Sequence, residues 1–155
     1  MQGIRLSRIA GAMALIGAIG VAALAFADGA DVIKARRALM KANGDGAKVM
    51  GAMLEGKSPF DAKAAAAAAT ATAAAAHGFG VDFDKNFAAG SETGDTKASP
   101  DIWKNKDDFV KRAMALETDA NAVVAAAATG EDAFKAAAGK MFGNCKGCHE
   151  KYKLQ

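Results

Sequence analysis

Two cysteines and a histidine lie close together near the C-terminal end of the sequence. The stretch from Gly143 to Lys153 reads GNCKGCHEKYK. It holds both cysteines of the chain, Cys145 and Cys148, with His149 directly after them. Cys-x-x-Cys-His is the attachment signature of c-type haem, in which two thiols add to the vinyl groups and the imidazole ligates iron. The sequence therefore predicts one covalently bound haem c per chain.

The spacing of these residues suits a helix. On a helix, Cys145 and His149 are four residues apart and stack on one face, while Cys148 lies one step round it. This arrangement places both sulfurs along one porphyrin edge, with the ring nitrogen of the histidine beneath the iron. The motif is therefore expected on a helix that faces the cofactor.

Three other interpretations of the cysteines remain open at this point. A dithiol oxidoreductase also uses Cys-x-x-Cys, but typically in a βαβ context that the helical pattern of this chain lacks. A structural zinc site needs four ligands, and only His77 or a carboxylate could complete the set. The third interpretation is a pair of buried cysteines without chemistry. Haem is favoured because the motif, the start of the chain and the helical pattern agree.

The start of the chain predicts export. Two arginines precede an apolar run over 9–24, which ends in the small-residue cleavage signature at 25–27. The run is short for a bilayer span, which needs about 20 apolar residues. We therefore expect 1–27 to be a cleaved signal peptide and 28–155 to be one mature domain in the periplasm.

The mature chain is expected to be almost neutral. The whole sequence has 20 basic and 17 acidic residues, and removal of the two signal arginines leaves 18 against 17, a net charge of +1. Nucleic-acid binding requires a clustered excess of Lys and Arg, so this balance argues against it. Two cysteines separated by two residues also close too small a loop for a stabilising disulfide.

Helical periodicity appears four times, and no useful strand pattern appears. A first helix is expected over 30–55, with the turn signal NGDG at 43–46 as a soft centre. Ser58-Pro59 predicts the start of a second helix that stops near Gly78, and Ser99-Pro100 predicts the start of a third. A fourth follows Gly130. The predicted fold class is all-α, an antiparallel four-helix bundle.

Several side chains are assigned to packing rather than to chemistry. The third helix carries the clearest apolar register, with a stripe at Phe109, Ala113, Leu116, Ala120, Val123 and Ala127. Core positions are also expected for Phe79, Phe83, Phe87, Trp103, Tyr152, Met50, Met53, Met114 and Met141. His77, at the end of the second helix, is expected to be solvated.

Four segments together resemble a known family. VIKARRALM on the first helix, GKSPFD opening the second, SPDIW opening the third and CKGCHEKYK on the fourth occur in the order found in class II c-type cytochromes. The resemblance spans Asp31 to Lys153. It is to cytochrome c′ and its low-spin, methionine-ligated cousins, which are four-helix bundles. Bundles of this family often pair through their first two helices, so a homodimer is one expectation.

The resemblance also implies roles for individual residues. Cys145 and Cys148 become the thioether anchors, and His149 becomes the proximal iron ligand. Lys153, one turn beyond His149, stands where relatives carry a cation beside the proximal face. Arg36 matches a first-helix arginine that could pair with a haem propionate.

Met40 separates the two functions that the resemblance implies. The position four residues after Arg36 faces the distal side of the haem in this family, and here it carries a thioether. Methionine opposite histidine saturates the iron and suits electron transfer. The leading expectation is a non-enzymatic, periplasmic monohaem carrier of single electrons, ligated by His149 and Met40 and serving redox partner proteins. The alternative is a five-coordinate cytochrome c′ that binds NO or CO, in which Met40 stays away from the iron.

Overall fold

The computed structural model describes residues 28–155, and within that range every regular element is a helix. The four long helices are α1 (Gly29–Leu54), α2 (Ala62–Gly80), α5 (Lys106–Thr129) and α6 (Glu131–Tyr152). Two single-turn helices, α3 (Phe83–Asn86) and α4 (Asp101–Lys104), flank residues 87–100, which we call the crossing loop. The predicted signal peptide at 1–27 lies outside the described residues.

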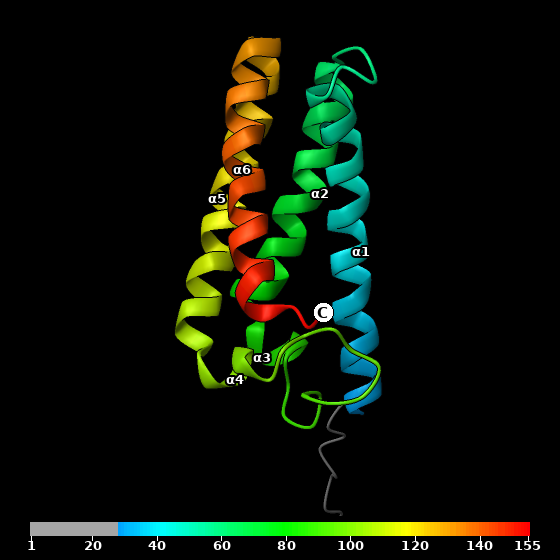
Figure 1. Cartoon of the computed structure of the whole chain (residues 1–155), viewed down its shortest axis with the longest axis vertical. Coiled ribbons are helices and arrows are strands. Elements are labelled where there is room, and N and C mark those ends of the chain that lie inside the picture. The colour runs from blue at the N-terminus through cyan, green and yellow to red at the C-terminus, as the bar shows by residue number, and fades with distance from the viewer. Residues whose placement is uncertain (1–27) are drawn as a thin grey trace, which may run out of the picture.

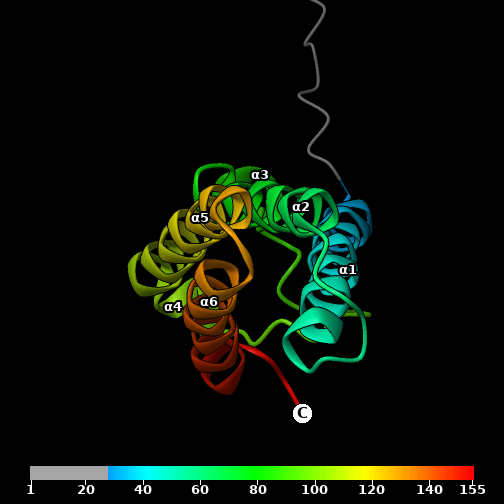
Figure 2. The same cartoon turned by 90° about the horizontal axis from the view of Figure 1, so that it is seen from above.

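The long helices form the predicted antiparallel four-helix bundle. In Figure 1, α1 and α5 rise while α2 and α6 descend, and the crossing loop passes beneath the bundle. Seen along the bundle in Figure 2, the helices follow one another round a ring in the order α1, α2, α5, α6. The pairs α1–α2, α2–α5 and α5–α6 pack closely, whereas α1 and α6 touch little. The space between α1 and α6 is therefore the place for a buried group.

Helix α1 runs without a break through the NGDG segment. A Cβ atom at Gly46 would lie 2.7 Å from the carbonyl oxygen of Ala68 on α2, closer than real Cβ contacts come. Glycine is needed at this position because α1 and α2 approach each other closely there. The expectation of one helix is confirmed, and Gly46 serves packing rather than a turn.

The predicted start of α2 is wrong, whereas its predicted end near Gly78 agrees with the observed end at Gly80. The helix begins at Ala62, where Asp61 accepts a hydrogen bond from the backbone N–H of Ala64 at 2.9 Å. Ser58 and Pro59 belong to the preceding loop, because Phe60 must first reach the core ring of Phe134, 5.3 Å away between centroids.

At its other end, α2 continues through Gly78 to Gly80. A Cβ atom at Gly78 would meet the Leu39 side chain of α1 at 2.9 Å, so this glycine also marks a close helix contact rather than a stop.

The predicted start of the third helix at Ser99-Pro100 is only partly right. Ser99 Oγ does accept a hydrogen bond from the backbone N–H of Asp101, at 3.2 Å. The helix that follows is only the single turn of α4. The chain breaks at Asn105, whose side chain donates to the carbonyl of Asp101 at 3.0 Å, and α5 begins at Lys106.

The core confirms most of the packing assignments. All six residues of the predicted α5 stripe are buried, as are Met50, Met53, Met141, Phe79, Phe83 and Phe87. Met114 is 50% exposed, so its assignment to the core is wrong. Met114 directly follows the buried Ala113. Neighbouring residues on a helix point in different directions, so Met114 lies outside the buried face of α5. No described helix is long and apolar enough to cross a membrane.

Candidate haem site

The three residues of the Cys-x-x-Cys-His motif line one cavity wall on α6, where the two cysteines are partly buried and His149 is exposed. Cys148 and His149 line a cavity of about 310 Å³, and Cys145 lines a smaller one of about 40 Å³ beside it, together with Cys148 and His149. Both cysteines are free and partly buried. The helix spacing therefore places two thiols and an imidazole along one wall, as the sequence predicted.

Both cavities lie between α1 and α6, and they share part of their walls. Residues in both walls are Met40, Phe79, Phe109, Cys148 and His149. Phe87, Ile102 and Tyr152 add further apolar surface to the larger cavity. The space is thus lined mainly by aromatic and aliphatic side chains, which suits a flat apolar group with a few polar contacts.

Met40, on α1, lines both of these cavities from the side opposite α6. Its side chain is 40% exposed, and its Sδ lies 3.9 Å from the Nδ2 of Asn43, one turn further along α1. The structure therefore brings Met40 of α1 and His149 of α6 to one cavity. The bond of either side chain to iron stays a prediction.

Arg36 is fully enclosed rather than solvated. It donates to Ser91 Oγ at 3.1 Å, to the Ser91 carbonyl at 2.9 Å and to Thr96 Oγ1 at 3.0 Å. Its guanidinium also lies over the rings of Phe87 and Trp103, at 5.0 and 5.4 Å from their centroids. These contacts fasten the crossing loop to α1. Arg36 also lines the larger cavity, so it is within the predicted haem site. Its contact with a haem propionate stays a prediction.

Lys153 lies at the rim of the larger cavity, and its backbone is held in place. Lys153 forms an isolated bridge with Ala98, and the flanking backbone N–H groups of Ser99 and Leu154 bond across the same junction at 2.9 and 2.8 Å. Burial lowers the pKa of the His149 imidazole, and the positive charge of Lys153 lowers it further. The amine thus acts electrostatically on the histidine, and its role beside a haem stays a prediction.

The thiols are poorly suited to redox catalysis. Burial raises the pKa of Cys145, and it raises the pKa of Cys148 to about 11 against the opposing effect of Arg112. Dithiol oxidoreductases need a thiolate, which a lowered pKa provides. Residues 28–155 also contain no group of three His, Cys, Asp or Glu side chains that could hold a metal ion. Neither the oxidoreductase nor the zinc interpretation gains support.

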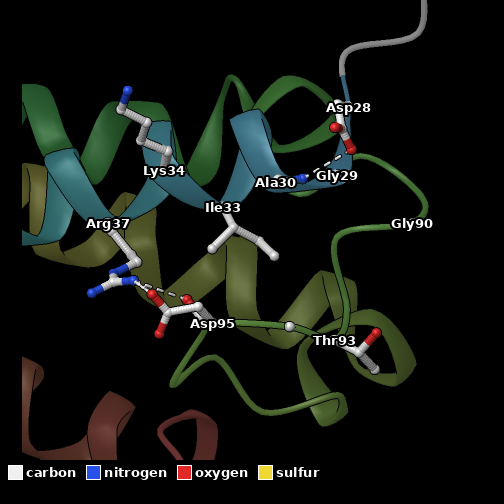
Figure 3. A pocket seen from close by; sticks show the side chains of 10 residues that line it. Asp28, Gly29, Ala30, Ile33, Lys34, Arg37, Gly90, Thr93 and Asp95 are labelled. Atoms are coloured by element: carbon white, nitrogen blue, oxygen red, sulfur yellow. Dashed lines mark hydrogen bonds and ion pairs between the residues drawn. The ribbon is translucent and has the colours of Figure 1, made fainter.

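A third cavity, which we call the loop cavity, lies apart from the motif residues. It has a volume of about 450 Å³ and is formed by the start of α1 and the crossing loop. Figure 3 shows Ile33 directed toward the loop, Arg37 paired with Asp95, and Lys34 pointing away. None of the motif residues lines this cavity, so its size does not make it the cofactor site.

Asn43 was not assigned to the site from the sequence, where it counted only as part of a turn signal. It lines the smaller cavity with Arg112 and Asn144. Its Oδ1 is buried without a hydrogen-bond partner, the only such side-chain atom within residues 28–155. A polar residue within a stripe of apolar positions on α1 was the available signal.

Comparison with known proteins decides the family. The sequence model described as Cytochrome C′ matches residues 31–153. The chain belongs to the cytochrome c′ family. It therefore carries covalently attached haem c, and the thiols and the apolar walls between α1 and α6 fit such a group.

Relatives named cytochrome c-556 and relatives named cytochrome c′ are both similar to this chain. Cytochrome c-556 of Agrobacterium fabrum is 36% identical over 123 residues, which cover 79% of this chain and 81% of that protein. Cytochrome c′ of Rhodopseudomonas palustris is 34% identical over 160 residues, covering 98% and 97%. Among solved structures, cytochrome c prime from Shewanella frigidimarina has a TM-score of 0.74 at 36% identity, covering 84% and 99%.

Proposed function

We propose that this protein carries single electrons in the periplasm as a monohaem cytochrome ligated by His149 and Met40. The observation that carries the proposal is that these two side chains, from α6 and α1, line the same pair of cavities. The similarity to cytochrome c-556 of Agrobacterium fabrum supports it. Cleavage after Ala27 and export of 28–155 belong to the same proposal.

Each residue then has a defined task. Cys145 and Cys148 fix the cofactor to α6 through thioether bonds, and His149 is positioned between them and Lys153. When bound, haem supplies an iron that alternates between Fe(III) and Fe(II). Met40 would supply a soft thioether to the iron, which favours the reduced metal.

The apolar walls of the larger cavity and the lysines at its rim have separate tasks. Phe79, Phe109 and Tyr152 keep the site apolar, so little solvent has to reorganise when the charge of the site changes. Lys153 and Lys97 present amines at the rim, where an acidic redox partner would be attracted. The protein needs no substrate site for this task, and we propose no enzymatic activity.

A second function has its own supporting observation. Met40 is 40% exposed, and its sulfur accepts a contact from Asn43 on the same helix. A side chain with that freedom could leave the iron open to NO or CO, and the similarity to cytochrome c′ of Rhodopseudomonas palustris fits this function.

Binding of CO separates the two functions. With Met40 on the iron, the reduced wild type binds CO slowly, and Met40→Leu binds it rapidly because the leucine leaves the position open. Stopped-flow mixing with CO measures both. If the wild type binds CO as fast as Met40→Leu, the gas-binding function is the correct one.

A further inference from the structure

Asn43 carries the only unsatisfied buried side-chain atom in the described part of the chain. The residue is 7% exposed, and its Oδ1 has no partner. Buried amide oxygens are nearly always hydrogen-bonded, because leaving one unpaired is destabilising. An exception of this kind points to a partner that is not part of the polypeptide.

The orientation of the amide identifies the atom that needs a partner. The Nδ2 of Asn43 donates toward the Sδ of Met40 at 3.9 Å, and a thioether sulfur can only accept. Turning the amide over would lose this contact and leave an N–H group buried instead. The unpaired atom is therefore the carbonyl oxygen, and it requires a hydrogen-bond donor.

The cavity in front of Asn43 has room for one. Its volume of about 40 Å³ exceeds the roughly 10–15 Å³ that a water molecule requires. The guanidinium of Arg112 lies in the same wall and uses its Nε for Asp108, at 2.9 Å. Its remaining N–H groups are donors to an oxygen atom. A water molecule would thus find an acceptor in Asn43 and a donor in Arg112.

The cofactor itself does not provide the missing donor. An iron porphyrin has no N–H group, and its propionates are acceptors when ionised. Carbon monoxide and nitric oxide have no hydrogen to donate either. A small protic molecule supplies the donor that the carbonyl lacks.

We propose that Asn43 and Arg112 bind one small protic molecule, water in the resting protein, in the cavity beside Met40. The site favours hydrogen-bond donors over CO and NO, because these gases leave the Asn43 carbonyl unpaired. A gas molecule entering this cavity must first displace the water. The inference does not depend on whether Met40 binds the iron.

A crystal structure of the haem-loaded wild type tests the site without any variant. We expect an ordered water within about 2.7–3.2 Å of Asn43 Oδ1. A map that resolves other buried waters but shows this cavity empty would overturn the proposal. So would a carbonyl that has turned to bond a protein donor.

Gas kinetics test the displacement step. In the Met40→Leu background, adding Asn43→Leu removes the anchor of the water, so CO association should become faster by about 3- to 30-fold. The control is Asn121→Leu, an exposed amide on α5 that lines neither cavity. Equal rates with and without Asn43 would contradict the proposal. Because both arms lack Met40, this result is separate from the question of its ligation.

Discussion

The hydroxyl of Tyr152 donates a hydrogen bond of 2.6 Å to the carboxylate of Asp108 and so joins the last turn of α6 to the start of α5. The same carboxylate accepts from Arg112 at 2.9 Å and from Lys151 at 3.0 Å. Tyr152 is buried against Phe109 and lies one turn beyond His149. Asp108 therefore holds the segment of α6 that carries His149.

Acid should weaken this junction. The hydrogen bonds from Tyr152, then Arg112 and Lys151, hold the pKa of Asp108 well below its ordinary value. A carboxyl whose pKa is lower in the folded state than in the unfolded state stabilises the protein at any pH above its unfolded-state pKa, which is about 4. This stabilisation is lost as the pH falls toward the folded-state pKa. Asp108→Asn should therefore lower the melting temperature at pH 7, with a gap from wild type that narrows toward pH 3. Thermal unfolding monitored by circular dichroism measures it.

The control for this experiment is Asp107→Asn, which removes an exposed charge from the same turn. Its effect should be small and should not narrow in the same way. A gap for Asp108→Asn that stays constant across this pH range would show that its charge does not hold the junction.

The close approach of α1 to α2 predicts opposite effects for two glycines of one helix. Gly46→Ala should destabilise the protein by about 1–3 kcal/mol, because its Cβ would press on the Ala68 carbonyl. Gly51→Ala has open space around it and should stabilise by about 0.5–1 kcal/mol through helix propensity. Urea unfolding gives both values. Stabilisation by both substitutions would mean that the helices are not in contact at Gly46.

Removing Arg36 should release the crossing loop. Arg36→Met takes away the donors to Ser91 and Thr96 and should cost about 2–4 kcal/mol, since buried acceptors lose a charged partner. Hydrogen exchange should accelerate across 88–98. The exposed pair of Arg37 with Asp95 contributes less than about 1 kcal/mol, so Arg37→Met is the matched control. Equal effects of the two substitutions would argue against the anchoring role.

Loss of the thioether anchors should remove both cofactor and stability. Cys145→Ala with Cys148→Ala is expected to give no haem staining on a denaturing gel. An empty cavity of about 310 Å³ corresponds to about 7 kcal/mol, which is comparable with the whole stability of a domain. The double variant should therefore melt far below the wild type. A stained band, or native-like melting, would contradict this prediction.

Features encoded by local spacing were predictable from the sequence. The stripe from Phe109 to Ala127 is buried at every predicted position because helix periodicity alone fixes a face. The motif from Cys145 to His149 lines one wall for the same reason. The family also followed from four short segments, and the match over 31–153 confirms it.

Features set by contacts between distant segments were not predictable in this way. Gly46 and Gly78 read as turn signals, but each one permits contact with another helix. The start of α2 depends on Phe60 reaching Phe134, which lies 74 positions further along the chain. Asn43 gained a role only when α1 and α6 were seen to enclose a cavity around it.

The spectrum of the haem-loaded wild type tests the pairing of Met40 with His149 most directly. Absorption and magnetic circular dichroism should show six-coordinate, low-spin iron in both oxidation states. The oxidised protein should also show a sulfur-to-iron charge-transfer band that Met40→Leu lacks. A wild type with five-coordinate, high-spin reduced iron and no such band would contradict the pairing and make this protein a gas-binding cytochrome c′.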